Sequence, residues 1–150
     1  MLHRISARGY LEKDNKVLFI EYKDEFGIFY ALPGGRQEVN EFLAETLVRE
    51  FKEEVCLDVE VAEVIMVREF TRETSEFEPW RNGIHQVEVI FRCKCTDESQ
   101  TACDGSVPDP GSRGLKWIDK SDFNKYRIYP LQNLIEEIEN PSFSYLTSRD

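Results

Sequence analysis

The alternation of apolar and polar positions in the first part of the chain predicts short strands. Residues 4–11 and 16–22 are β-rich runs, and the polar Lys13-Asp14-Asn15 between them predicts a hairpin. Residues 29–32 predict a brief third strand that runs into the turn Pro33-Gly34-Gly35. Later apolar runs predict further strands over 58–70, 84–95 and 115–118.

Apolar residues at helical spacing predict an amphipathic helix over 41–55. At about 100° per residue, one face collects the apolar side chains Leu43, Ala44, Leu47, Val48, Phe51 and Val55. The opposite face carries the charged side chains Arg49, Glu50, Glu53 and Glu54. Asn40 is suited to be the N-cap. Phe42 falls on the polar side, so either the helix starts later or Phe42 makes a contact outside the core.

The rest of the chain predicts a second helix and two long polar stretches. Residues 130–139 begin with a proline, which favours the first helical position, and carry an apolar stripe. The stretches 71–83 and 97–114 predict loops, and the second is rich in Gly, Pro, Ser and Asp and predicts mobility. Strands mixed with two helices predict an α/β fold, an α/β/α sandwich with a mixed β-sheet. The length of 150 residues predicts a single domain over 1–150.

Composition and charge narrow the partners of the chain. It is 41% hydrophobic and 32% charged, as is typical of a soluble globular enzyme. A formal net charge of −10 disfavours binding to nucleic acids, which are themselves polyanions. We see no charged-then-apolar leader and no apolar run as long as a membrane span, so we expect a cytoplasmic protein without a membrane partner.

Four cysteines, Cys56, Cys93, Cys95 and Cys103, do not form a metal-ligand spacing pattern. Cys93 and Cys95 alternate within a predicted strand, so both face the same side. This arrangement predicts buried free thiols in a reducing compartment, and not a disulfide framework.

Three carboxylates on the predicted helix, Glu50, Glu53 and Glu54, are close neighbours because they are three and four residues apart. Like charges at this spacing repel one another, and a divalent cation offsets the repulsion. Ligands that are all oxygen favour a hard ion such as Mg²⁺. The alternative is a solvated helix face on which the glutamates pair with Arg49 and Lys52.

The segment 35–57 resembles the signature of the Nudix hydrolase family, G-x5-E-x7-R-E-U-x-E-E-x-G-U, where U is a bulky apolar residue. The positions in register are Gly35, Glu41, Arg49, Glu50, Phe51, Glu53, Glu54 and Leu57. The preceding Tyr-Ala-Leu-Pro-Gly-Gly also resembles the strand and turn before this box. Cys56 stands where the family has its second glycine. A left-handed backbone there would cost a cysteine roughly 1 kcal/mol.

The resemblance implies a division of roles among these residues. Metal ligands would be the carboxylates of Glu50, Glu53 and Glu54 and the carbonyl of Gly35, holding Mg²⁺, with Mn²⁺ as a substitute. Catalytic roles would fall to Glu53 or Glu54 as general base, to Glu41 through metal or water, and to Arg49, which orients a glutamate. Glu98 and Asp104 in the predicted mobile loop compete as general base. Substrate would contact Gly34, Gly35 and Arg36.

The activity that the resemblance implies is Mg²⁺-dependent hydrolysis of a pyrophosphate bond. Its substrate would be a small molecule, a nucleoside diphosphate linked to another moiety, and a homodimer is compatible with the resemblance. A nucleoside triphosphate pyrophosphohydrolase of the sanitising type is the first alternative. The second is a nucleotide-binding sensor without catalysis, although such sensors commonly lose box glutamates that are all present here.

Overall fold

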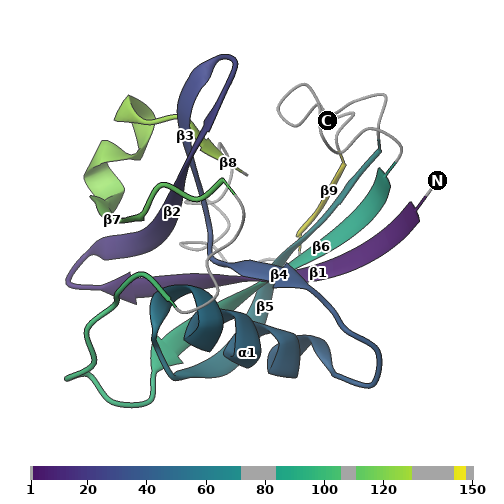
Figure 1. Ribbon diagram of the computed structural model, residues 1–150, viewed down its shortest axis with the longest axis horizontal. Coiled ribbons are helices and arrows are strands. Elements are labelled where there is room, and N and C mark those ends of the chain that lie inside the picture. The colour runs from purple at the N-terminus through teal and green to yellow at the C-terminus, as the bar shows by residue number, and fades with distance from the viewer. Residues whose placement is uncertain (1, 72–83, 106–110, 130–143, 148–150) are drawn as a thin grey trace.

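A computed structural model describes residues 2–71, 84–105, 111–129 and 144–147 of the chain. The elements in chain order are β1 (Leu2–Lys13), β2 (Lys16–Asp24), β3 (Gly27–Ala31), β4 (Gly34–Arg36), α1 (Leu43–Val55), β5 (Val59–Phe70), β6 (Ile84–Cys95), β7 (Leu115–Asp119), the 3-10 helix η3 (Lys120–Lys125), β8 (Ile128–Tyr129) and β9 (Ser144–Thr147). The strands form a curled sheet, and α1 lies on one side of it (Figure 1).

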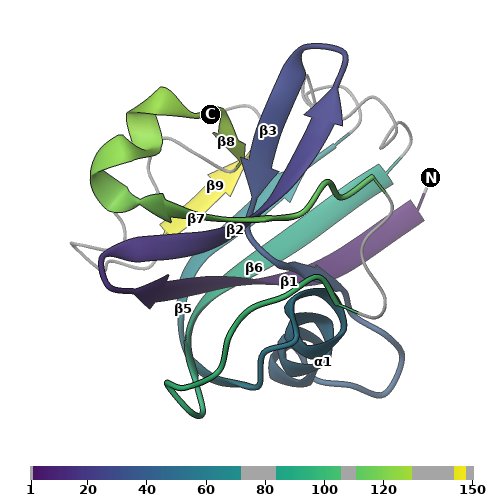
Figure 2. The same ribbon diagram turned by 60° about the vertical axis from the view of Figure 1, so that its left-hand side comes forward.

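The described strands pair into one mixed sheet with the order β8-β3-β2-β1-β6-β5-β9. At its centre β6 lies parallel to β1 and antiparallel to β5. Figure 2 shows β1, β6 and β5 side by side. Beside this path β4 pairs with β1, and β7 pairs with β2. The mixed sheet of an α/β fold, predicted from the sequence, is confirmed.

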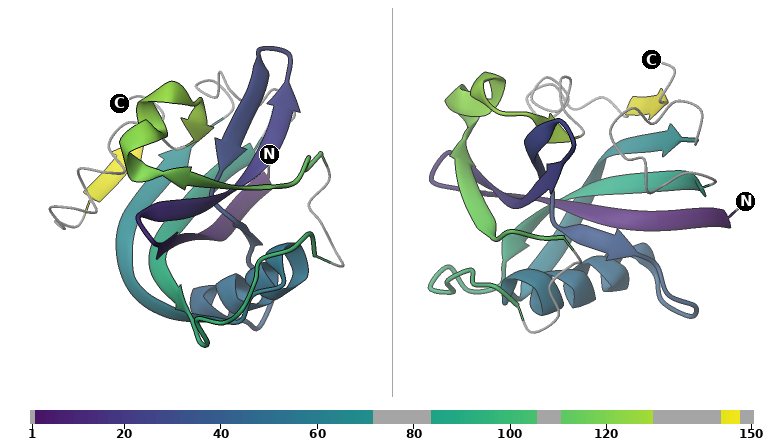
Figure 3. Two further views of the ribbon diagram at one scale, coloured as in Figure 1. Left: turned by 90° about the vertical axis from the view of Figure 1, so that its left-hand side faces the viewer. Right: turned by 45° about the horizontal axis from the view of Figure 1, so that its top comes forward.

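Two apolar clusters fill the two sides of the sheet. On one side α1 packs below the central strands (Figure 3), with Leu47, Phe51 and Val55 fully buried. On the other side, β2, β3, β7 and η3 enclose the second cluster. Its buried members include Tyr10, Phe19, Leu32, Met66, Ile90, Ile118 and Phe123. The sheet therefore separates the two apolar clusters, and α1 packs against only one of them.

The turn between β1 and β2 is as predicted. Asp14 and Asn15 have φ values of 53° and 63°, which suit the two-residue turns of hairpins. Asparagine and aspartate tolerate this conformation better than other non-glycine residues do. Three short strands, β4, β8 and β9, were not predicted, because two to four residues are too few to establish a period.

The start of α1 differs from the prediction. The helix begins at Leu43 after Phe42, whose amide N–H donates to Oε2 of Glu45 at 2.6 Å. Of the two explanations for Phe42, the later helix start is confirmed, and its side chain is 79% exposed. The N-cap prediction for Asn40 is wrong, because Asn40 adopts a left-handed backbone with φ 69° in the preceding turn.

The cysteine prediction is wrong for two of the four residues. Cys56 and Cys103 form a disulfide with their Cα atoms 5.6 Å apart. Cys93 and Cys95 are free thiols in β6, as predicted, and burial raises the pKa of Cys93 to about 12. The sequence could not predict the bond, because the partners are 47 residues apart and meet only through the return of the loop after β6.

Several predictions fall on residues outside the described parts. These are the helix over 130–139 and most of the loop over 71–83, together with positions 106–110 of the second loop. Among the residues that the structure does describe, none of the helices is long and apolar enough to cross a membrane.

Replacing Phe51 by Ala should lower the free energy of unfolding by about 3–5 kcal/mol, because its ring is fully buried between α1 and the sheet. Urea unfolding followed by circular dichroism measures this loss. Val48 was predicted on the same apolar face but is 39% exposed, so Val48→Ala is the matched control, with an expected change below about 0.5 kcal/mol. Equal losses in the two variants would contradict the assignment of the buried face.

Candidate active site

The approach of β4 to α1 brings a main-chain segment against a carboxylate. A Cβ atom on Gly35 would lie 2.3 Å from Oε1 of Glu50, so no other residue fits without moving that side chain. Gly34 is more tightly constrained, since its Cβ would lie 2.1 Å from the main-chain carbonyl oxygen of Ala7 and its φ is 150°. The two glycines of the predicted box therefore serve close approach, one toward β1 and one toward α1.

Strand β1 pairs with the residues of this glycine turn. Arg8 pairs with Gly34, and Ala7 pairs with Gly35, in the antiparallel ladder between β1 and β4. The amide of Gly9 donates to the carbonyl of Pro33 at 2.9 Å. The position of Gly35 against Glu50 thus depends on the central strand of the sheet.

A buried ionic cluster supports the same turn from the other side of the sheet. Glu88 is fully buried and forms ion pairs with Arg8 and with Arg68, the second at 3.2 Å. Arg8 also donates to the carbonyl of Leu32 at 2.8 Å. This cluster was not predicted, although the position of Glu88 between two valines of a predicted strand indicated a buried acidic residue.

Arg49 lies among the carboxylates of the box. Its guanidinium donates to Oε1 of Glu41 at 2.8 Å, to Oε1 of Glu50 at 3.0 Å and to Oε2 of Glu53 at 3.4 Å. It also donates to the carbonyl of Arg36 at 3.1 Å, which ties α1 to the end of β4. These bonds, that to Glu41 foremost, raise the pKa of Arg49. Arg49 is placed to orient glutamates.

Glu41 organises the turn that leads into α1. Its carboxylate accepts hydrogen bonds from Arg49, from the Thr46 hydroxyl at 2.8 Å and from the amide of Glu38 at 2.8 Å. The bond from Arg49 is the main cause that lowers the pKa of Glu41 to about 2. Glu41 is therefore ionised over the physiological range. Its contact with a metal or a catalytic water stays a prediction.

Glu54 does not share the exposed face on which the sequence analysis placed it. It is only 6% exposed, one helical turn beyond Glu50 and beside Val55. The main chain after Cys103 covers this end of the helix, and the amide of Gly105 donates to the carbonyl of Glu54 at 2.9 Å. A buried carboxylate of this kind is favoured when a cation lies beside it.

The donor set fits a hard divalent cation by its chemistry. Three carboxylates, Glu50, Glu53 and Glu54, come from the last two turns of α1, the first of them adjoins Gly35, and all of these donors are oxygen atoms. Over the described parts of the chain, no three His, Cys, Asp or Glu side chains are already gathered as a metal-binding group. Glu50 and Glu53 both accept hydrogen bonds from Arg49, so a cation at these carboxylates would compete with its guanidinium for their oxygen atoms.

The two competing general bases occupy different places. Asp104 is exposed and follows Cys103 directly, so the disulfide places it beside the C-terminal end of α1. The carbonyl of Glu98 accepts a hydrogen bond from Lys13 at the end of β1. Of the two, Asp104 lies next to the helix of the box. Arg36 is exposed at the end of β4, one residue from Gly35.

The two histidines of the chain lie close together in the fold. The rings of His3 and His85 lie 5.1 Å apart, and His85 contacts the carboxylate of Glu69. His3, His85 and Glu69 are not among the predicted site residues. They lie on β1, β6 and β5, at the strand ends opposite the disulfide.

Comparison with known proteins identifies the family of the chain. Residues 2–137 match the family model of the NUDIX domain. The chain belongs to the Nudix family. The resemblance drawn from the segment 35–57 is thereby confirmed, and it extends over most of the chain.

Relatives of this Nudix chain differ in how much of it they match. An ADP-ribose pyrophosphatase of Methanocaldococcus jannaschii is 42% identical over 64 residues, which make up 42% of this chain and 38% of that protein. The Bacillus subtilis (strain 168) protein YjhB is 28% identical over 129 residues, 85% of this chain and 53% of its own length. The chain thus aligns with about half, or less, of these curated relatives.

Solved structures share the fold of this Nudix chain. The crystal structure of a Nudix hydrolase from Nitrosomonas europaea superposes with a TM-score of 0.67 at 21% identity. The match covers 96% of this chain and 78% of the other. At this identity the likeness establishes the architecture alone.

Replacing Arg49 by Gln should raise the pKa of Glu41 from about 2 toward its ordinary value near 4.5, because the main hydrogen bond to the carboxylate is lost. A lowered pKa contributes stability that is present above about pH 4.5 and is lost as the pH falls toward 2. The variant should therefore lose less stability over that interval. An NMR titration of the Glu41 carboxyl carbon and unfolding at each pH measure the two effects.

Lys52→Gln is the control for this experiment, because the Lys52 side chain is 74% exposed and pairs only weakly with Asp58 at 3.7 Å. It should leave the titration of Glu41 unchanged. A Glu41 pKa that stays near 2 in the Arg49 variant would refute the assigned cause.

Proposed function

We propose that this Nudix chain is a Mg²⁺-dependent hydrolase of the pyrophosphate bond in a nucleoside diphosphate linked to another moiety. The observation that carries the proposal is the contact of Gly35 with Glu50, in which Arg49 holds Glu50 and Glu53 together beside the main chain of β4. The Methanocaldococcus jannaschii relative is an ADP-ribose pyrophosphatase, which makes ADP-ribose the first substrate to test.

In this proposal Glu50, Glu53, Glu54 and the carbonyl of Gly35 would hold Mg²⁺, and Mn²⁺ would replace it. The bound ion would neutralise phosphate charge and lower the pKa of a bound water. The polypeptide contributes rigidity, because the carboxylates project from consecutive turns of a helix that is anchored by the fully buried Leu47, Phe51 and Val55. The oxygen donors and the buried position of Glu54 support this ligand set.

Arg49 would act as a positioning residue, since its bonds restrain Glu50 and Glu53 while Glu41 fixes the guanidinium. Glu53 or Glu54 would accept the proton of the attacking water, with Asp104 as the competing base. The glycine turn and the exposed Arg36 would receive the phosphates, which the net charge of −10 would otherwise repel. A cytoplasmic location, a homodimer and the absence of nucleic-acid and membrane partners stay predictions.

Changing Glu53 or Glu54 to Gln should lower kcat at least about a hundredfold, because either change removes a charged ligand or the general base. Turnover of ADP-ribose in the presence of Mg²⁺ measures the loss, and circular dichroism confirms folding. Glu60→Gln is the matched control, an exposed glutamate on β5 whose pairing with Lys94 at 3.6 Å is weak. Full activity in both box variants would remove the assigned roles.

Chelation by EDTA should abolish turnover, and excess Mg²⁺ or Mn²⁺ should restore it, because the ligands are carboxylates that do not polarise a diphosphate by themselves. The assay should compare ADP-ribose, nucleotide sugars, dinucleotides and nucleoside triphosphates, with products identified by mass spectrometry. Cleavage of ADP-ribose to AMP and ribose 5-phosphate is the expected result. Release of pyrophosphate from triphosphates alone would favour the sanitising activity, and turnover unchanged by EDTA would refute metal dependence.

A further inference from the structure

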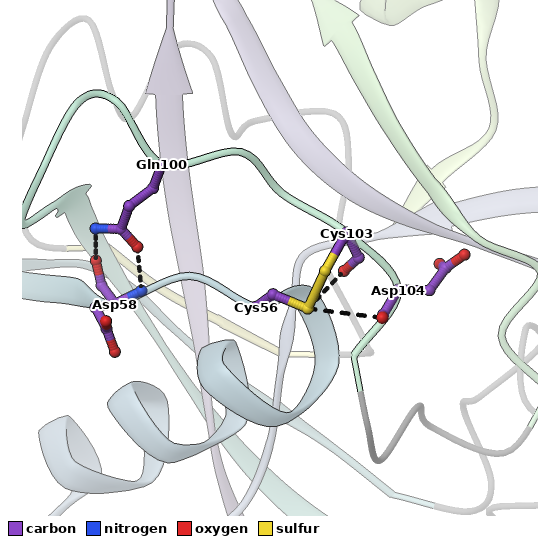
Figure 4. Close-up of a disulfide and its surroundings, with 5 residues drawn as sticks. All are labelled: Cys56, Asp58, Gln100, Cys103 and Asp104. Atoms are coloured by element: carbon purple, nitrogen blue, oxygen red, sulfur yellow. Dashed lines mark hydrogen bonds between the residues drawn. A yellow bond between two sulfur atoms is a disulfide. The ribbon is translucent and has the colours of Figure 1, made fainter.

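The disulfide joins the end of the box helix to the loop that follows β6. Cys56 is the residue directly after α1 and has a left-handed backbone, with φ 62° and ψ 24°. Cys103 reaches it from the segment 96–105, which runs back alongside the end of the helix (Figure 4). Both cysteines are exposed to solvent. A bond in this position is open to attack by an external thiol.

The segment held by this bond completes the hydrogen bonding of the helix end. The last carbonyls of a helix have no partner within the helix itself. Here the amide of Cys103 donates to the carbonyl of Val55 at 3.0 Å, and the amide of Gly105 donates to that of Glu54 at 2.9 Å. A Cβ on Gly105 would lie 1.7 Å from the carbonyl oxygen of Glu53, so the contact is close enough to require glycine.

A second anchor holds the same segment and does not depend on the disulfide. The amide of Asp58 donates to Oε1 of Gln100 at 2.8 Å, and the amide of Thr96 donates to the carbonyl of Asp58 at 3.0 Å. Opening the disulfide would therefore leave the segment attached at Gln100. Only its end, residues 103–105, would lose a covalent restraint, and this is the part that contacts Glu53 and Glu54.

We propose that Cys56 and Cys103 form a reversible thiol–disulfide site, opened by a dithiol reductant, that controls how firmly residues 103–105 are held against the last turn of α1. The consequence for metal binding rests on the proposed function, since Glu53 and Glu54 belong to that turn. With the bond closed, the turn is restrained by the loop. With it open, the turn frays more easily, and the two carboxylates are held less well.

The chemistry of the site is a two-electron exchange. A thiolate of the dithiol attacks one cysteine sulfur, which breaks the Cys56–Cys103 bond, forms a mixed disulfide and releases the other cysteine as a thiolate that takes up a proton. The second thiol of the reductant, after losing its proton, attacks the mixed disulfide. The products are two protein thiols and a cyclic disulfide of the reductant, so two electrons and two protons pass to the protein. A disulfide oxidant reverses both steps.

The other two cysteines differ from this pair in access. Burial raises the pKa of the Cys93 thiol to about 12 and also raises the pKa of Cys95. Both therefore stay protonated at neutral pH, and the attacking species in exchange is the thiolate. These two thiols are therefore poor nucleophiles toward the Cys56–Cys103 bond, which is the disulfide that an added reductant would open in the described residues.

The test compares the full chain before and after treatment with dithiothreitol. Hydrogen exchange at the amides of Cys103 and Gly105 should accelerate at least about tenfold on reduction, because these amides bond to the helix end. The amide of Thr96 should change little, since its anchor is independent. Titration with Mn²⁺, followed by electron paramagnetic resonance, should show affinity at least about threefold weaker in the reduced form.

Two variants separate the bond from other effects. Cys103→Ser, which cannot form the bond, should match the reduced form with or without dithiothreitol. Cys95→Ser, which alters a free thiol, should respond to dithiothreitol as the original chain does. Unchanged exchange at Cys103 and Gly105 on reduction would overturn the inference, as would unchanged Mn²⁺ affinity. If neither form binds Mn²⁺, the proposed function fails, and exchange alone decides the inference.

Discussion

The contact between the main chain of Gly35 and the carboxylate of Glu50 is the constraint on which the candidate site depends. It requires a residue without a Cβ on β4 and a helix at a fixed distance from that strand. The ladder between β1 and β4 supplies the first condition, and the apolar face of α1, with Phe51 buried against the sheet, supplies the second. Movement of either element would change the distance between the main chain of Gly35 and the carboxylate of Glu50.

Both ends of α1 are tied down by polar contacts, which matters because the helix presents its carboxylates from the final turns. At the start, Glu41 and Arg49 form a hydrogen-bonded link that spans the first two turns. At the end, the carbonyls of Glu54 and Val55 receive donors from the loop after β6. Repulsion among the glutamates is therefore opposed by Arg49 at one side and by restrained main chain at the other.

The acidic side chains on the two faces of the sheet differ in burial and in how their charge is compensated. On the side of α1, the acidic residues are partly exposed around Arg49, where a cation can reach them. On the opposite side, Glu88 is fully buried and is compensated by Arg8 and Arg68. Removing one member of such a buried set leaves an uncompensated charge, which is far more destabilising than the loss of a surface pair. The second set thus belongs to the framework that fixes the glycine turn.

Local pattern was sufficient for much of this protein: the β1–β2 hairpin, β6 and the helix of the box follow from alternation, helical period and turn residues, and the family follows from spacing within 35–57. These signals come from residues close together in the sequence, so they can be recognised without the tertiary structure. Three features could not be read from the sequence, because each depends on segments far apart in it: the burial of Glu54, the Arg8–Glu88–Arg68 cluster and the Cys56–Cys103 bond. Such contacts are decided by packing of the whole sheet, which brings together residues whose separation carries no periodic signal.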